Sequence, residues 1–124
     1  MKTYTVKVDN NGDKSWYLNG KRHRKDGPAV EYTDGSKFWY LNGKRHRKDG
    51  PAVEYANGSK FWWINNKLHR EDGPAIEFAN GIKEWWINNK IVTEQDVLDF
   101  SKTIEIEGVK YSIAQIKAAL KKVA

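Results

Sequence analysis

Three histidines recur at a fixed place in this 124-residue chain, each followed three positions later by an aspartate. Imidazole and carboxylate groups together can bind a metal ion or transfer a proton. If each repeat adds two strands to a sheet, equivalent histidines lie about 9 to 10 Å apart, whereas a zinc ligand lies only about 2.1 Å from its ion. We therefore expect no metal site and no cofactor. Instead, we expect the imidazoles to pack or bond across repeats and the aspartates to bond turn amides. The pairs are His23 and Asp26, His46 and Asp49, and His69 and Asp72.

Lysines and arginines flank these histidines and offer a second kind of chemistry, the binding of anions. The clusters are Lys21-Arg22-His23-Arg24-Lys25, Lys44-Arg45-His46-Arg47-Lys48 and the less basic Lys67-Leu68-His69-Arg70-Glu71. The whole chain has a formal net charge of +6 and a pI of about 9.4. Basic loops beside aromatic side chains suit phosphates and unstacked bases, so direct RNA or DNA binding is one functional alternative. Acidic residues at Asp26 and Glu31, and at their equivalents, interrupt a continuous positive track, and a solvated loop edge is the simpler interpretation.

Recognisable catalytic signatures are missing from the sequence. It has no cysteine, no G-x-S-x-G, no phosphate loop and no dinucleotide fingerprint. Its recurring carboxylates, Glu31, Glu54 and Glu77, belong to a strand pattern instead of a distinctive pair. An enzyme site is usually one asymmetric constellation, whereas a repeated array offers an extended surface. We therefore expect a protein that is not an enzyme.

A 23-residue unit places all of these residues, running through the chain three times nearly unchanged and a fourth time in degraded form. The units are 11–33, 34–56, 57–79 and 80–102, with Trp16, Trp39, Trp62 and Trp85 at the same phase. Because a unit this short cannot bury a core alone, neighbouring copies must stack. The chain is thus expected to comprise an N-terminal capping strand at 1–10, four repeats at 11–102 and a C-terminal cap at 103–124.

Each unit predicts two main strands joined by tight turns. Residues 37–41 are rich in aromatic side chains and residues 52–55 alternate, so both segments favour strands. Asx-Gly pairs at 34–35, 57–58 and 80–81 predict hairpin turns, and Asn-Gly pairs at 19–20 and 42–43 reverse the chain on the far side. The equivalent Asn-Asn pairs at 65–66 and 88–89 lack glycine, but asparagine tolerates positive φ. The predicted fold is mainly β, an elongated single antiparallel sheet of stacked hairpin repeats.

Both ends of the array carry signals for caps. Residues 1–8 alternate as a strand that can cover one edge of the sheet. Thr93 predicts a helix N-cap with acidic residues in the first turn, so the fourth unit ends in a short helix. Residues 103–111 predict a hairpin, and Ser112 with Gln115 matches the capping box of a final amphipathic helix. We expect this helix to cover the last hairpin, and partner binding by its apolar stripe is the alternative.

The pattern W-[YW]-x-N-[GN]-K-x-H-R-x-D-G-P-A, found at 39–52 and 62–75, resembles the MORN-type repeat family in the variant common in bacterial and phage proteins. The resemblance covers residues 11 to about 90. It implies hairpins stacked into an elongated curved sheet and an interaction scaffold, with membrane-lipid binding proposed for some members. By analogy alone, it also implies a phage-type inhibitor of a host enzyme that handles nucleic acid or serves in defence.

Alternation divides the aromatic strand between two faces of the sheet. We expect one face to form the core, through Trp16, Trp39, Trp62 and Trp85 with Leu18, Leu41, Ile64 and Ile87. The opposite face is either a binding groove or a second core closed by loops. Its aromatic residues and the first two basic loops supply the expected partner-binding set: Tyr17, Phe38, Tyr40, Phe61, Trp63, Trp86, Lys21, Arg22, Arg24, Lys44, Arg45 and Arg47.

We therefore expect a non-enzymatic protein-interaction module. Direct RNA or DNA binding and attachment to anionic membrane surfaces through the same lysines and arginines are the alternatives. A homodimer formed through open sheet edges is a further expectation left open. The absence of cysteine and of a basic-plus-apolar N-terminal segment favours a cytoplasmic location.

Overall fold

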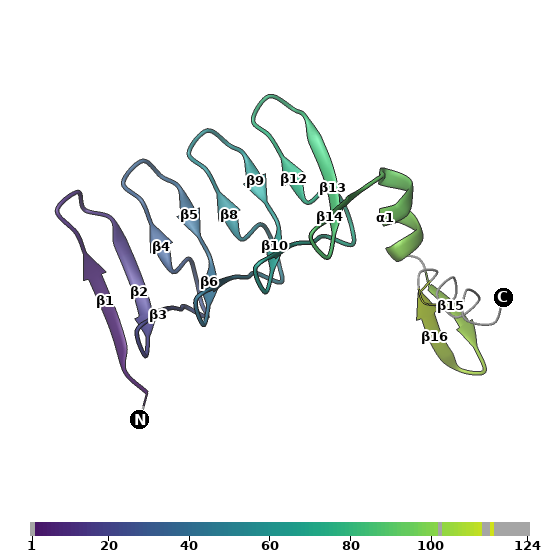
Figure 1. Ribbon diagram of the computed structural model, residues 1–124, viewed down its shortest axis with the longest axis horizontal. Helices are drawn as coiled ribbons and strands as arrows, with labels where there is room; N and C mark the ends of the chain where they lie inside the picture. The colour runs from purple at the N-terminus through teal and green to yellow at the C-terminus, as the bar shows by residue number, and fades with distance from the viewer. Residues whose placement is uncertain (1, 102, 113–114, 116–124) are drawn as a thin grey trace.

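A computed structural model of the chain describes residues 2–101, 103–112 and 115. The protein is mainly β, and its strands form an open antiparallel sheet of stacked hairpins followed by a short helix (Figure 1). The predicted fold class is confirmed. The main sheet runs in the order β1 (Tyr4–Val8), β2 (Lys14–Leu18), β4 (Val30–Glu31), β5 (Lys37–Phe38), β8 (Val53–Glu54), β9 (Lys60–Phe61), β12 (Ile76–Glu77), β13 (Lys83–Ile87) and β14 (Lys90–Val92).

A second row of small hairpins lies below the main sheet (Figure 1). These hairpins are β3 (Lys21–Arg22) with the end of β2, β6 (Tyr40–Leu41) with β7 (Lys44–Arg45), and β10 (Trp63–Ile64) with β11 (Lys67–Leu68). The expected aromatic strand 37–41 is interrupted at Trp39, because its N–H donates to Ala52 O (2.7 Å) while its carbonyl accepts from His46 N (3.1 Å). The second and third units therefore fold in two at their tryptophans, whereas β2 and β13 run unbroken through Trp16 and Trp85.

The turns of the lower hairpins place both central residues at positive φ. The φ values are 50° and 79° at Asn42-Gly43, 47° and 68° at Asn65-Asn66, and 49° and 65° at Asn88-Asn89. Positive φ at both positions matches the right-handed twist of the flanking strands, and asparagine adopts it more readily than most residues. The prediction that asparagine adopts positive φ in the two turns without glycine, at 65–66 and 88–89, is confirmed.

Neighbouring units are joined through these lower hairpins. Arg24 N donates to Tyr40 O (3.1 Å), and Gly43 N donates to Arg22 O (2.8 Å). His23 adds a side-chain link, because its Nδ1 accepts a hydrogen bond from the Asn42 amide at 3.0 Å. The two later histidines accept in the same way, at 3.0 Å each, from the amides of Asn65 and Asn88. The imidazoles thus bond across repeats as predicted.

The buried core differs from the one that the sequence predicts. Its apolar members lie mainly on the short strands β4, β8 and β12 and on the residues before them: Ala29, Val30, Ala52, Val53, Ala75 and Ile76. The tryptophans and the Leu and Ile residues expected to form the core, Trp16, Trp39, Trp62, Trp85, Leu18, Leu41, Ile64 and Ile87, are only half-buried. That prediction is wrong because loops, and not a second apolar layer, cover this face of the sheet.

The C-terminal part begins with helix α1 (Glu94–Ser101), which follows a reciprocal cap. Thr93 N donates to Asp96 Oδ2 (3.0 Å), and Asp96 N donates to Thr93 Oγ1 (3.1 Å), so the predicted N-cap is confirmed. Strands β15 (Thr103–Ile106) and β16 (Val109–Ser112) then form the predicted hairpin. Ser112 and Gln115 exchange hydrogen bonds of 2.8 and 3.0 Å, as in a capping box.

The rest of the predicted final helix, and with it the alternative that this helix binds a partner, lies outside the described residues. Within the part of the chain that is described, no helix has both the length and the apolar character needed to cross a membrane.

Candidate functional site

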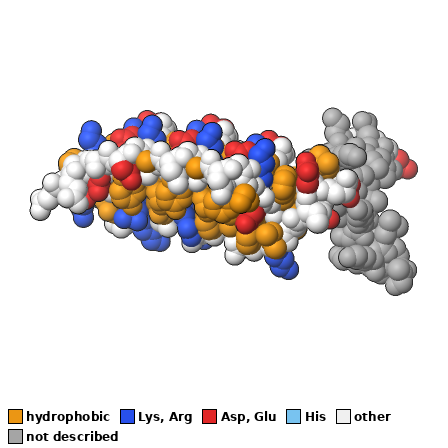
Figure 2. Space-filling view, turned by 90° about the horizontal axis from the view of Figure 1, so that it is seen from above, with side chains coloured by type: hydrophobic (Ala, Val, Ile, Leu, Met, Phe, Trp, Pro, Cys, Tyr) orange, Lys and Arg blue, Asp and Glu red, His pale blue; other side chains and the backbone are white. Residues whose placement is uncertain are grey.

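Aromatic side chains from successive units form a continuous ladder on one face of the main sheet. Neighbouring ring centroids are separated by 5.3 Å from Tyr32 to Phe38, 5.6 Å to Tyr55, 5.5 Å to Phe61 and 5.9 Å to Phe78. All four contacts are edge-to-face, an arrangement favoured by about 0.5–1.5 kcal/mol beyond area burial. Seen from above, hydrophobic side chains form a band that runs lengthwise over the repeats (Figure 2). We call Tyr32, Phe38, Tyr55, Phe61 and Phe78 the aromatic ladder.

Strand register explains the ladder. Phe38 lies directly opposite both Val30 and Val53, and Phe61 lies opposite both Val53 and Ile76. The residues two positions after each of these aliphatic residues project on the same side, because side chains alternate along a strand. Three ladder members were missed from the sequence, namely Tyr32, Tyr55 and Phe78. Their alternation with the buried aliphatic residues was the signal that could have found them.

A second aromatic column continues from this ladder into the lower hairpins, and cations of the preceding strands cover it. Phe38 stacks with Tyr40 at 6.5 Å. Arg22 Cζ lies 5.5 Å from the Tyr40 ring, and Arg45 Cζ lies 3.7 Å from the Trp63 ring. Lys7 covers Tyr17 in the same way at 5.0 Å. The structure thus brings the expected residues Tyr17, Tyr40, Trp63, Arg22 and Arg45 together as half-buried stacks.

The end of this column differs from its middle. Trp86 Nε1 donates to Glu84 Oε1 at 3.0 Å, and the position of the covering arginine is occupied in the third unit by the buried Leu68. On the ladder side, burial raises the pKa of the Tyr32 phenol, although the nearby Arg22 charge opposes this shift. The phenol is therefore neutral at physiological pH and can act as a hydrogen-bond donor.

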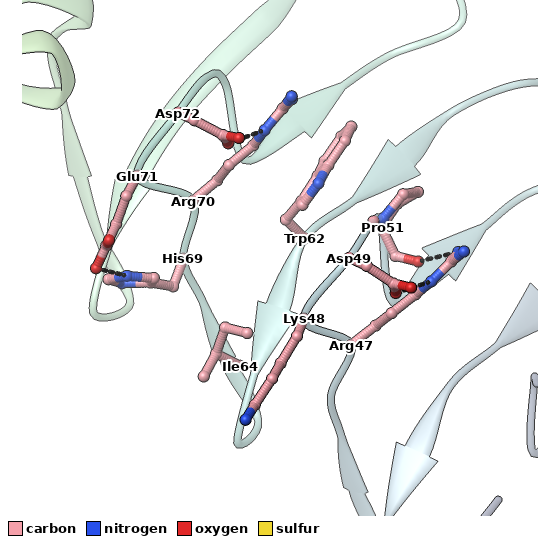
Figure 3. Close-up of a pocket in the computed structure, with 11 residues that line it drawn as sticks. Arg47, Lys48, Asp49, Pro51, Trp62, Ile64, His69, Arg70, Glu71 and Asp72 are labelled. Carbon is pink, nitrogen blue, oxygen red and sulfur yellow. Dashed lines mark hydrogen bonds and ion pairs between the residues drawn. The ribbon is translucent and has the colours of Figure 1, made fainter. Parts of the chain in front are cut away.

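The arginine that directly follows the histidine in each basic loop is engaged inside its own unit. Arg47 Cζ lies 4.0 Å over the Trp39 ring, Nε pairs with Asp49 Oδ1 (3.1 Å), and Nη1 donates to Pro51 O (3.1 Å) and pairs with Glu54 (3.4 Å). The same contacts recur in the other units at Arg24, over Trp16, and at Arg70, over Trp62. We call this arrangement the arginine clasp, and parts of two clasps are visible in Figure 3.

The clasp changes the interpretation of two expected site residues. Arg24 and Arg47 hold the Asp-Gly-Pro loop onto the tryptophan, so their guanidinium groups already have partners within the chain. The aspartate that was expected to bond turn amides instead accepts from the arginine Nε in each of the three units. Lys21 and Lys44, by contrast, are exposed at the start of the lower hairpin returns.

Lysines and glutamates alternate in register across the face that carries the tryptophans. The row runs Lys14, Glu31, Lys37, Glu54, Lys60, Glu77 and Lys83, each directly opposite the next on the neighbouring strand. Opposite charges at directly paired positions stabilise a sheet, whereas like charges would destabilise it. This row therefore carries no continuous positive track.

Three clefts open on the same face, one between β1 and the first Asp-Gly-Pro loop and two between successive loops. Their volumes are about 480, 630 and 870 Å³, and they contain His23, His46 and His69 respectively. Figure 3 shows the largest, with His69 and Glu71 at one end and Lys48 reaching alongside Ile64. Burial, reinforced by the Lys48 charge, lowers the pKa of His46, so its imidazole is neutral at physiological pH. Among the described residues, no three His, Asp or Glu side chains are grouped to hold a metal ion.

No family model, curated protein or solved structure matches this chain.

Proposed function

We propose that this chain is a non-enzymatic protein-interaction module that holds a protein partner on its aromatic ladder. The observation that carries the proposal is the unbroken run of five rings from three units, with Tyr55 42% exposed at its centre. Extended aromatic patches of this kind usually mark binding sites, and tyrosine is enriched among the residues that dominate binding energy.

The charges favour a protein partner over a nucleic acid. Affinity for nucleic acid depends on lysines and arginines that neutralise phosphates. Here the clasp arginines are paired within the chain, and the lysines of the main sheet face glutamates directly. The formal net charge of +6 favours a partner with an acidic rim, because complementary fields raise association rates. The MORN-type resemblance further suggests that the partner is a host enzyme that this chain inhibits.

The test is an affinity purification from cell lysate, with and without nuclease, using the wild type, Tyr55→Ala and Val8→Ala. Val8 is a matched control because it is 61% exposed and pairs with Lys14, away from the ladder. We expect a nuclease-resistant protein partner that the wild type and Val8→Ala retain and that Tyr55→Ala loses.

Three results would contradict the proposal. Equal retention by Tyr55→Ala would remove the ladder from the interface. Recovery of nucleic acid alone would favour direct RNA or DNA binding. Co-sedimentation with anionic but not neutral vesicles, in place of a protein partner, would favour the membrane alternative.

A further inference from the structure

His23, His46 and His69 make the same hydrogen bond through Nδ1, but the surroundings of Nε2 differ among them. In each histidine, Nδ1 accepts a hydrogen bond from a backbone amide of the next unit at 3.0 Å. In a neutral imidazole the other nitrogen, Nε2, must then carry the proton and act as a donor. His69 Nε2 has an acceptor in its own loop, Glu71 Oε1 at 3.1 Å (Figure 3). His23 Nε2 is buried without a hydrogen-bond partner, in a side chain that is only 6% exposed.

One sequence position accounts for this difference. The loops read H-R-x-D-G-P-A at 23–29, 46–52 and 69–75, and the variable residue is Lys25, Lys48 and Glu71 in turn. The third unit therefore supplies its own carboxylate to the imidazole. The first and second units have a lysine at this sequence position instead, and its positive charge attracts an anion from outside. A buried donor that lacks an acceptor is costly, so an acceptor that reaches His23 gains binding energy.

We propose that His23 with Lys25, and His46 with Lys48, form two binding sites for carboxylate side chains of an acidic protein segment. The His23 site lies in the cleft between β1 and the first Asp-Gly-Pro loop, and the His46 site lies in the cleft between the first and second loops. Glu71 is the built-in occupant of the third. A carboxylate is favoured over a phosphate because the carboxylate of Glu71 already fits this position. The sites go beyond the proposed aromatic contact, since they lie on the tryptophan face and can be tested without it.

The repeat also sets the spacing of the two carboxylates. Each unit contributes two strands to the main sheet, so equivalent histidines are about 10 Å apart. A polyproline II segment rises about 3.1 Å per residue with three residues per turn, so side chains three positions apart project to one side at about 9.3 Å. A Glu-x-x-Glu segment in this conformation matches both sites at once.

The probe is the capped peptide acetyl-Glu-Pro-Pro-Glu-amide, titrated into the full-length protein while the imidazole nitrogen resonances are followed by NMR. We expect saturable shifts of Nε2 in His23 and His46, and none in His69. Acetyl-Gln-Pro-Pro-Glu-amide, which can fill only one site, should bind about tenfold more weakly because it loses one charged hydrogen bond.

Two reciprocal variants test the mechanism at exposed loop positions. Lys25→Glu should fill the first site as Glu71 fills the third, so His23 no longer responds. Glu71→Lys should empty the third site, so His69 begins to respond.

Inorganic phosphate and a short single-stranded oligonucleotide serve as competing probes. Unchanged resonances of His23 and His46 with the acidic peptide, or an undiminished His23 response in Lys25→Glu, would overturn the proposal. Tighter binding of phosphate or oligonucleotide than of the peptide would also overturn it, in favour of a nucleic-acid site. Failure of these sites would leave the Tyr55 test of the aromatic ladder unaffected.

Discussion

Replacing Arg47 by alanine tests whether the arginine clasp holds each loop to the sheet. The hydrogen bond from Nη1 to Pro51 O, at 3.1 Å and partly buried, contributes about 1 kcal/mol. The stack on Trp39 at 4.0 Å adds about 0.5–1 kcal/mol. Asp49 is 87% exposed, so solvent screening limits the two ion pairs to about 0.5 kcal/mol together. Arg47→Ala should therefore lower the free energy of unfolding by about 2 kcal/mol.

Urea denaturation followed by tryptophan fluorescence measures this loss. Arg47→Lys should lose about half as much, because lysine keeps the charge but cannot make the planar fork of bonds. Lys48→Ala is the matched control, since this exposed neighbour lies in the same loop. Asp49→Asn should cost only a few tenths of a kcal/mol. The reasoning is refuted if Arg47→Ala costs no more than Lys48→Ala, or if Asp49→Asn costs as much as Arg47→Ala.

Three further predictions concern the loops and turns. Gly73→Ala should be destabilising, because a Cβ there would lie 2.7 Å from Arg70 Cζ, and this cost should largely vanish in an Arg70→Ala background when the two are compared in a double-mutant cycle. Asn66→Ala should lower the free energy of unfolding in urea by about 1 kcal/mol more than Asn66→Gly, because both remove the Oδ1 acceptor of Arg45 Nε (2.9 Å) but only glycine avoids the Cβ penalty at a φ of 68°. The fold lowers the pKa of His46 below its value in the unfolded chain, because the folded state disfavours the charged imidazole. The contribution of His46 to the free energy of unfolding is therefore fully present above about pH 6.5 and is lost as the pH falls below that value. The urea midpoint should consequently drop less between pH 7.5 and 5.5 in His46→Gln than in the wild type, and an equal drop would contradict this assignment.

The features predicted correctly from the sequence are those with local causes. Turns at Asn42-Gly43 and Asn65-Asn66 follow from the φ preferences of single residues, and the Thr93 cap follows from a side chain bonding three residues away. The predicted tryptophan core was wrong because the burial of a side chain such as Trp39 depends on which distant residues cover it. Its cover is the Arg47 guanidinium, from a loop whose charges suggested full exposure to solvent.

The residues of the candidate site also differ in whether a local pattern could predict them. Phe38 and Phe61 were identified because they alternate within an aromatic strand. Tyr55 was missed because its strand was considered only as a pairing partner, although register places its ring within 5.6 Å of both phenylalanine rings. The His46 cleft forms only where one unit stands beside the next, and the His23 cleft only where β1 stands beside the first unit, so no property of a single repeat could reveal them.

The backbone bonds that join the lower hairpins have a consequence for how such a protein can change over generations. Arg24 N to Tyr40 O, Arg47 N to Trp63 O and Arg70 N to Trp86 O are each 3.1 Å long, so every junction offers the next copy the same donors and acceptors. An in-frame duplication of one repeat would therefore insert without a new kind of junction and lengthen the molecule by about 10 Å. The number of acidic residues that it can read along a partner is then set by copy number, and slippage during DNA replication becomes a route to altered specificity.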